Sequence, residues 1–224
     1  MVVEINKPKE EIVQEIQKMS GQYSPDIIFS DWVKCSAIAI QNSCSLIHGK
    51  VWQIREEQYI STMKKYASPE QKSMSRMLVL LAEALGESMS DVLGEIYMES
   101  GCGSRQTGQF FTPFHVSKLV SEISLENIQE GKKIILNEPS SGGGGMIIAA
   151  AKTIKDRGIN YQKCMKVTAQ DLDWRSVYMS YIQMSLLGID AKVVQGNTLS
   201  EPYANSSYPK ECIFRTPRNM GVLI

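Results

Sequence analysis

The sequence predicts an α/β fold in which an all-helical N-terminal domain (residues 1–105) precedes a domain built on a parallel sheet (residues 106–224). Three short apolar stretches follow residue 130, and helical stretches separate them, which is the pattern of a parallel α/β sheet. The first hundred residues instead repeat apolar side chains at helical spacing. A glycine-rich break at residues 101–108 separates the two patterns and marks the expected domain boundary.

Apolar side chains at helical spacing predict four helices in the first hundred residues. Two of them open on serine–proline pairs, Ser24-Pro25 and Ser68-Pro69, which combine a hydroxyl N-cap with a proline in the first turn. The predicted apolar faces are Ile12, Val13, Ile16 and Met19; Ile28, Trp32, Val33 and Ala37; Met74, Met77, Leu78, Leu81 and Leu85; and Val92, Leu93, Ile96 and Tyr97.

The predicted strands cover residues 133–137 (KIILN), 165–170 (MKVTAQ) and 191–195 (AKVVQ), with weaker candidates at 211–214 and 221–224. Each of the first three is a short apolar stretch that a helical pattern separates from the next.

The composition excludes several classes of protein. The chain has 224 residues, with 24 Lys and Arg and 24 Asp and Glu, so bulk positive charge does not hold it on nucleic acid, although a local basic patch stays open. Its longest apolar stretch, residues 142–151, is too short to cross a bilayer, and the first ten residues lack the apolar core of a signal peptide. We therefore expect a cytoplasmic protein with no membrane partner.

The cysteine and histidine pattern predicts no metal site. The five cysteines are widely spaced, and the two histidines, His48 and His115, are isolated, whereas a zinc site needs clustered ligands. An odd number of scattered cysteines is typical of free thiols in a reducing compartment.

The strongest local feature is the loop at residues 137–146 (NEPSSGGGGM), between the first strand and an apolar helical run. Four glycines at such a turn let a backbone approach a ligand closely, and the following helix offers free N–H groups. The alternative is a flexible turn without a ligand.

An acid follows the second strand. Asp171 stands where nucleotide-binding α/β folds place a carboxylate that accepts hydrogen bonds from ribose hydroxyls. The nearby Asp173 is expected to have a different role, as the N-cap of the next helix, which Gly188 ends.

A third feature precedes the sheet. Thr112-Pro113 predicts a helix start, and its unpaired N–H groups could hold a carboxylate. Taken alone, an ordinary helix cap explains the pair equally well. The helix that follows has an apolar face of Val116, Leu119, Val120 and Ile123.

Together these segments resemble the N6-adenine DNA methyltransferases, and most closely the methylation (M) subunit of type I restriction-modification systems. That family has a Gln-aromatic-Phe-Thr-Pro segment before its sheet, which residues 109–113 (QFFTP) match. Its Asp-Pro-small-small-Gly-Thr-Gly-Gly loop is similar to residues 138–145 (EPSSGGGG), where Glu138 replaces Asp and Gly143 replaces Thr.

Two further segments extend the resemblance. Residues 196–199 (GNTL) resemble the family's Gly-Asp-Thr-Leu, with Asn197 in place of Asp, and residues 90–97 (SDVLGEIY) resemble its linker helix. The resemblance implies a Rossmann-like S-adenosylmethionine-dependent methyltransferase core. The cofactor-binding residues that it implies are Gln109, Phe110, Phe111, Thr112, Pro113, Glu138, Ser140, Ser141, Gly142, Gly144, Asp171 and Asn197.

The resemblance also implies an activity and partners. The chain would transfer a methyl group from S-adenosylmethionine to the N6 amine of adenine in DNA, together with a separate specificity or catalytic subunit. An incomplete sheet would leave an open edge that invites pairing with a partner or a second copy. A nicotinamide or flavin dinucleotide site is a weaker hypothesis that rests on the glycine loop alone.

The family's catalytic motif is absent from the sequence. In that motif, Asn/Asp-Pro-Pro-aromatic, polar atoms grip the amine of a flipped adenine and the aromatic ring stacks on the base. The prolines after Asn197 are Pro202, Pro209 and Pro217, and no two are adjacent. We therefore predict no catalytic residue, and the alternative function is a cofactor-binding subunit that acts as partner or regulator of a methylase complex.

Overall fold

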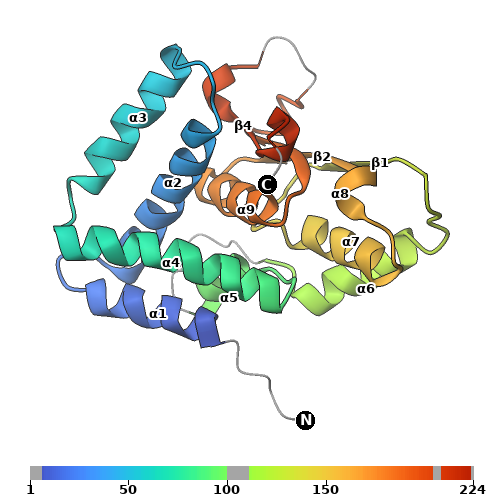
Figure 1. Cartoon of the computed structure of the whole chain (residues 1–224), viewed down its shortest axis with the longest axis horizontal. Helices are drawn as coiled ribbons and strands as arrows, with labels where there is room; N and C mark the ends of the chain where they lie inside the picture. The colour runs from blue at the N-terminus through green and yellow to red at the C-terminus, as the bar shows by residue number, and fades with distance from the viewer. Residues whose placement is uncertain (1–6, 100–110, 204–207, 223–224) are drawn as a thin grey trace.

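The computed structural model describes residues 7–99, 111–203 and 208–222. Five helices make up the N-terminal half (Figure 1): α1 (Lys7–Met19), α2 (Pro25–Ser43), α3 (Lys50–Met63), α4 (Ser68–Glu87) and α5 (Val92–Glu99). The four predicted helices are confirmed as α1, α2, α4 and α5. No helix in the described ranges is both long and apolar enough to cross a membrane.

Helix α3 has no apolar pattern to predict it, because its two buried side chains, Arg55 and Thr62, are polar. The Arg55 guanidinium donates from Nη2 to the backbone carbonyls of Glu211 (3.3 Å) and Ile213 (2.7 Å). The helix is therefore held by a contact with a segment about 150 residues away in sequence.

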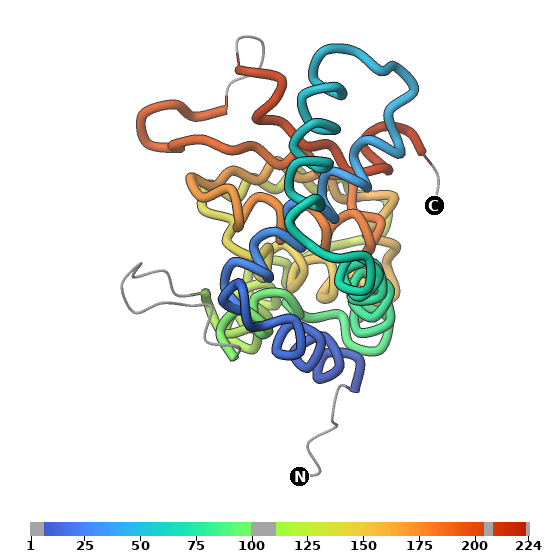
Figure 2. Tube along the Cα trace, turned by 90° about the vertical axis from the view of Figure 1, so that its left-hand side faces the viewer, coloured from blue at the N-terminus to red at the C-terminus, as the bar shows by residue number. Residues whose placement is uncertain are grey.

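The second half alternates helices and strands. Its helices are α6 (Phe114–Ser124), α7 (Gly145–Asp156), α8 (Tyr161–Cys164) and α9 (Trp174–Leu186), and its strands are β1 (Ile134–Glu138), β2 (Met165–Asp171), β3 (Asp190–Gln195) and β4 (Ile213–Arg215). Short 3₁₀ helices, η1 (Lys210–Cys212) and η2 (Arg218–Met220), flank β4. In Figure 2 these C-terminal segments, coloured red, lie at the end of the molecule opposite α1.

The strands form one sheet in the order β1-β2-β3-β4. The first three are parallel, as predicted, whereas β4 runs antiparallel to β3. The candidate strand at 211–214 is confirmed in part, because it begins at Ile213. The candidate at 221–224 is wrong for Gly221 and Val222, because Gly221 has a φ of 79° and ends η2; the rest of that candidate lies outside the described residues.

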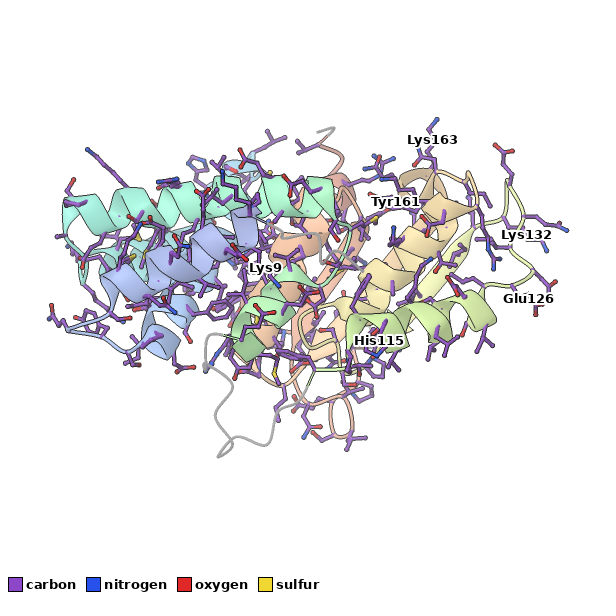
Figure 3. The ribbon with its side chains drawn as sticks, turned by 90° about the horizontal axis from the view of Figure 1, so that it is seen from below. Lys9, His115, Glu126, Lys132, Tyr161 and Lys163 are labelled. Atoms are coloured by element: carbon purple, nitrogen blue, oxygen red, sulfur yellow. The ribbon has the colours of Figure 1, made fainter. Side chains whose placement is uncertain are left out.

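Helix α9 packs between the sheet and α2, and α7 packs between β1 and α6. One hydrophobic core joins the two halves of the chain, with Trp32 and Leu93 from the first half and Ile148 and Tyr181 from the second. Lys9 of α1, which Figure 3 labels, forms an ion pair with Glu95 of α5, with 3.1 Å between the charged atoms. The predicted domain boundary falls among residues outside the described ranges, so the division at residue 105 stays a prediction.

Two of the four predicted N-caps are wrong. Helix α4 has Ala67 at its N-cap, and the Glu70 side chain accepts a hydrogen bond from the Ala67 N–H at 2.6 Å. Helix α6 begins after Pro113, which leaves the Thr112 side chain free of a capping role. The caps at Ser24 and Asp173 are confirmed, since these side chains accept from the N–H groups of Ile27 and Ser176.

The apolar stripe of α6 points away from the core. Val116, Leu119, Val120 and Ile123 are 39–68% exposed, while the small residues Ser117 and Ser121 are buried. Lys118 of α6 donates to Thr153 Oγ1 (3.1 Å) and Asp156 Oδ2 (2.8 Å) of α7, so α6 is held on α7 by its polar face.

We expect the double substitution Leu119→Lys and Ile123→Lys to change the free energy of unfolding by no more than about 0.5 kcal/mol, as is usual for exposed sites. In contrast, Ser121→Leu adds volume to the buried face and should cost about 1–3 kcal/mol. Urea denaturation measures both. A loss from the lysine pair as large as that from Ser121→Leu would show that the stripe is covered.

Candidate functional site

The glycine loop connects β1 to α7 at the carboxyl edge of the sheet. Gly142 and Gly144 have φ values of 52° and 96°, which side chains other than glycine rarely adopt. A Cβ on Gly144 would also lie 3.3 Å from Ser180 Cβ of α9. Glycine is therefore required at both positions for the loop to turn into α7.

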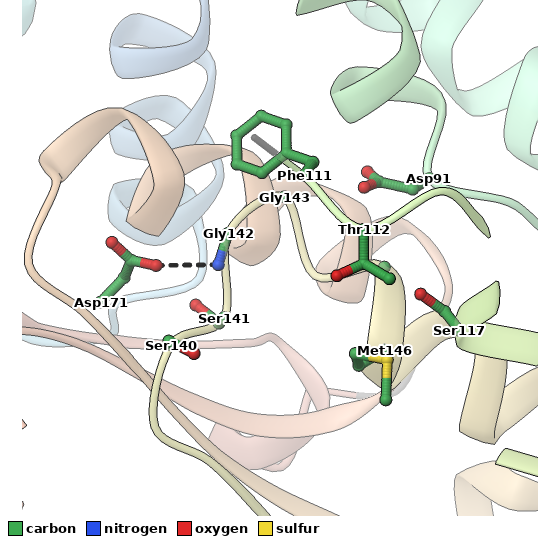
Figure 4. Close-up of a pocket in the computed structure, with 11 residues that line it drawn as sticks. Asp91, Phe111, Thr112, Ser117, Ser140, Ser141, Gly142, Gly143, Met146 and Asp171 are labelled. Carbon is green, nitrogen blue, oxygen red and sulfur yellow. Dashed lines mark hydrogen bonds between the residues drawn. The ribbon is translucent and has the colours of Figure 1, made fainter. Parts of the chain in front are cut away.

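Asp171 holds the loop in place. Its Oδ2 accepts a hydrogen bond from the Gly142 N–H at 2.8 Å (Figure 4). Its Oδ1 accepts from the Asp173 N–H at 3.0 Å. Burial raises the pKa of the Asp171 carboxyl, and the backbone donors partly offset that rise. A carboxylate oxygen has a second lone pair, so each oxygen can still accept from a ligand.

A pocket of about 350 Å³ lies over this loop. Its walls come from the segment before α6, from the glycine loop, and from the end of β2 (Figure 4). Six of the predicted cofactor residues line it, namely Phe111, Thr112, Ser140, Ser141, Gly142 and Asp171. The structure therefore brings together three motifs that lie up to 60 residues apart in the sequence.

Phe111 covers the glycine loop. The site of a Cβ on Gly142 would be 2.8 Å from Phe111 Cδ1, so the ring lies directly against the loop. The ring also packs on Tyr97 of α5, with the centroids 5.3 Å apart. The aromatic position of the motif thus closes the pocket toward the helical half.

Four predicted residues lie outside the pocket lining: Pro113, Glu138, Gly144 and Asn197. Burial raises the pKa of Glu138, whose carboxylate accepts from the Ser140 N–H at 3.3 Å. Asn197 accepts from the N–H groups of Leu199 (3.0 Å) and Ser200 (3.4 Å) and so caps a turn. Gln109 and Phe110 lie outside the described residues.

The pocket contains a carboxylate that the motif analysis does not assign. Asp91, at the start of α5, is only 4% exposed. Its Oδ1 accepts from the Gly94 N–H at 3.0 Å and from Gln183 Nε2 at 2.8 Å. Gln183 Nε2 also donates to the Gly143 carbonyl at 2.7 Å. Burial raises the pKa of Asp91.

Asp91 explains one departure from the family motif. A Cβ on Gly143 would lie 2.7 Å from Asp91 Oδ1, and a Cβ on Gly145 would lie 3.0 Å from Oδ2. The carboxylate therefore occupies the space that a side chain at position 143 would need. In the sequence, Asp91 is visible only as an acid within residues 90–97. Its contact with the glycine loop could not be predicted, because the two segments are far apart along the chain.

Two buried hydroxyls in the pocket wall lack a partner within the described part of the chain. These are Ser117 Oγ of α6 and Ser141 Oγ of the glycine loop. Since buried polar atoms in folded proteins are nearly always hydrogen-bonded, the two hydroxyls fit a pocket that receives a polar ligand.

Thr216 directly precedes Pro217, as a polar residue precedes proline in the family's catalytic motif, but its side chain has a structural role. Its fully buried side chain donates to the Ile189 carbonyl at 2.7 Å and accepts from the Ala191 N–H at 3.0 Å. The Thr216-Pro217 segment therefore fixes the end of β4 beside β3, and the hydroxyl is not available to a substrate.

Comparison with known proteins settles the family. Residues 88–218, more than half of the chain, match the family model described as N-6 DNA Methylase. The chain belongs to the N-6 DNA methylase family. The predicted resemblance is thereby confirmed, and the matched residues include the glycine loop, Asp91 and Asp171.

The fold is similar to that of a solved protein from Listeria monocytogenes described as a class I S-adenosylmethionine-dependent methyltransferase. The TM-score is 0.52 at 13% identity, over 89% of this chain and 56% of that one. The likeness confirms the predicted Rossmann-like fold. A type I restriction-modification system methyltransferase subunit from Streptococcus thermophilus matches at 16% identity and a TM-score of 0.46, over 85% of this chain and 43% of that one. The chain thus spans about half the length of both.

We expect Gly143→Ala to lower the free energy of unfolding by about 1–3 kcal/mol, the usual cost of overpacking a closed site. Gly86→Ala in α4 is the control, because a Cβ there meets nothing within 4 Å and should not destabilise a helix. Adding Asp91→Ala to Gly143→Ala should recover part of the loss, because the carboxylate no longer fills the space. Strictly additive losses in urea denaturation would contradict this packing.

Asp91→Asn should alter how stability depends on pH. The native state keeps the Asp91 proton to higher pH than the unfolded state, because burial raises the pKa above the ordinary 3.8. That group's contribution to the free energy of unfolding therefore decreases as the pH rises from about 4 through the raised pKa. We expect Asp91→Asn to gain stability relative to the native chain over that range, in denaturation curves at several pH values. A constant difference would argue against the raised pKa.

Proposed function

We propose that the chain binds S-adenosylmethionine in the pocket over the glycine loop and takes part in methylation of the N6 amine of adenine in DNA. One observation supports the proposal above the others. In a member of the N-6 DNA methylase family, the segment ending in Phe111-Thr112, the glycine loop and Asp171 meet in a single pocket.

The residues of the pocket fit the two polar ends of the cofactor. Asp171 would accept hydrogen bonds from the ribose hydroxyls, and the glycine loop would let the backbone approach closely. At the other end, Thr112 and the first N–H groups of α6 would hold the carboxylate. The remaining proposed cofactor residues are Gln109, Phe110, Pro113, Glu138, Ser140, Ser141, Gly142, Gly144 and Asn197.

The contribution of this chain to the reaction would be positioning. When bound, the cofactor supplies a methyl group on a positively charged sulfur. Holding both reactants in alignment can supply about 7–11 kcal/mol of the barrier reduction. The pocket residues would fix the cofactor, with Phe111 and the glycine loop closing around it. The 224 residues contain no Asn/Asp-Pro-Pro-aromatic segment, which is the motif that would grip the adenine amine.

The absent motif favours a second form of the proposal, in which this chain is the cofactor-binding or regulatory subunit of a cytoplasmic methylase complex. A specificity or catalytic subunit would then bring the adenine in DNA. In the described residues β1 pairs only with β2, and the apolar stripe of α6 is exposed nearby. An open strand edge and an apolar stripe are features that a partner subunit, or a second copy of the chain, would cover.

Calorimetric titration with S-adenosylmethionine tests the proposal. We expect micromolar binding to the native chain and at least a tenfold loss for Asp171→Ala, because that carboxylate both accepts from Gly142 and faces the ribose position. Glu83→Gln, an exposed substitution in α4 outside the pocket lining, is the control and should bind normally. The absence of binding to a folded native chain would refute the cofactor assignment.

Methyl transfer to adenine-containing DNA tests the reaction itself. The chain alone should be inactive, and activity should require a second subunit with the missing motif. Robust turnover by the chain alone would contradict the second form of the proposal.

A further inference from the structure

Two acids lie at the two ends of the pocket. Figure 4 shows Asp171 on one side of the glycine loop and Asp91 on the other, beside Thr112 and Ser117. Asp171 is engaged by backbone donors through both oxygens. Asp91 is not, because both of its donors, Gly94 N–H and Gln183 Nε2, bond to Oδ1. In the described part of the chain, Oδ2 has no hydrogen-bond donor.

In the described part of the chain, Asp91 also has no cationic partner. No lysine or arginine of the described ranges pairs with it. The charged side chain that acts on it is that of Glu95, another acid. A buried carboxylate without a counter-charge is costly, and proteins keep such groups where a ligand or metal completes them. Among the described residues, Oδ2 of Asp91 therefore lacks a positively charged donor.

We infer that Asp91 receives the α-ammonium group of the amino-acid end of S-adenosylmethionine. The inference rests on the proposed function, and it names the subsite that fixes the direction of the bound cofactor. The ribose end would lie at Asp171 and the zwitterionic end at Asp91, with the glycine loop between them.

The surroundings of Asp91 suit a zwitterion. The carboxylate next to the ammonium would meet Thr112 and the N-terminus of α6, where Ser117 Oγ is fully buried and has no partner among the described residues. The Asp91 carboxylate would thus face the ammonium group of an amino acid, and the donors beside it would face the carboxylate of the same amino acid. Glycine at positions 143 and 145 leaves the room that the Asp91 carboxylate occupies at the pocket wall, because a Cβ at either position would lie within 3.0 Å of one of its oxygens.

Asp91 also has a structural role that needs to be separated from this one. Oδ1 caps α5 through the Gly94 N–H. Asparagine is as good an N-cap as aspartate and has the same shape. Asp91→Asn therefore keeps the oxygen that caps the helix, and replaces the charged Oδ2 with a neutral donor that would repel an ammonium group.

The experiment compares two ligands that share a neutral sulfur and a nucleoside end. S-adenosylhomocysteine has the amino-acid end, whereas 5′-methylthioadenosine lacks it. By calorimetry, Asp91→Asn should bind S-adenosylhomocysteine at least tenfold more weakly than the native chain, yet bind 5′-methylthioadenosine within twofold of it. Asp171→Ala should weaken both ligands. Glu83→Gln, an exposed side chain of α4 outside the pocket lining, should change neither.

The outcomes separate the inference from the proposed function. If Asp91→Asn binds S-adenosylhomocysteine as the native chain does, Asp91 is a helix cap and the inference is wrong. If it weakens both ligands equally, Asp91 supports the loop and does not contact the ammonium, which also overturns the inference. If the native chain binds neither ligand, the cofactor assignment fails, and the subsite falls with it.

Discussion

The contact of Asp91 and Gln183 with the glycine loop is the constraint on which the site depends. Gln183 of α9 donates both to Asp91 and to the Gly143 carbonyl, so one amide joins α5, α9 and the loop. Its carbonyl oxygen accepts from the Leu93 N–H at 3.1 Å, which satisfies the other end of the amide. Because Gln183 is fully buried, these bonds form in a low-dielectric environment, where breaking any one would leave a polar group unpaired. The shape of the loop is therefore set by the helical half as well as by the sheet.

The helical half also supports the edge of the sheet at β4. Arg55 of α3 donates to the Ile213 carbonyl of β4 and lies 4.2 Å above the Phe214 ring, which packs against Tyr181 of α9. Burial lowers the pKa of this guanidinium, and the ring and the carbonyls stabilise its charge. The helical half thus contacts both the glycine loop after β1 and the last strand, β4. One hydrophobic core lies between the two halves of the chain.

What the sequence predicts well is what is encoded locally. The three parallel strands, the glycine loop and Asp171 follow from short apolar stretches and the turn residues beside them. Helix α3, the outward face of α6 and the place of Asp91 do not, because each depends on residues more than 30 positions away. The apolar residues of α6 indicate an amphipathic helix, yet nothing local says that its serines will pack on α7. Likewise, Asp91 is recognised from sequence only as a helix start, since its contacts with Gly143 and Gln183 span 50 to 90 residues.

The structure combines a preformed pocket with surfaces that have no partner in the described residues. The pocket is closed by Phe111, held by Asp171 and supported by Asp91, so a ligand would find its binding groups already arranged. In the described residues, β1 pairs only with β2, and α6 has an exposed apolar stripe. In the proposed function, cofactor binding would depend on the loops that follow β1 and β2, whereas recognition of the base would depend on the Asn/Asp-Pro-Pro-aromatic motif. The two tasks use different groups, so two subunits could divide them. The exposed stripe of α6 and the edge of β1 lie in the same half of the chain as most of the pocket residues, and a subunit that covers them would lie on that half of the molecule.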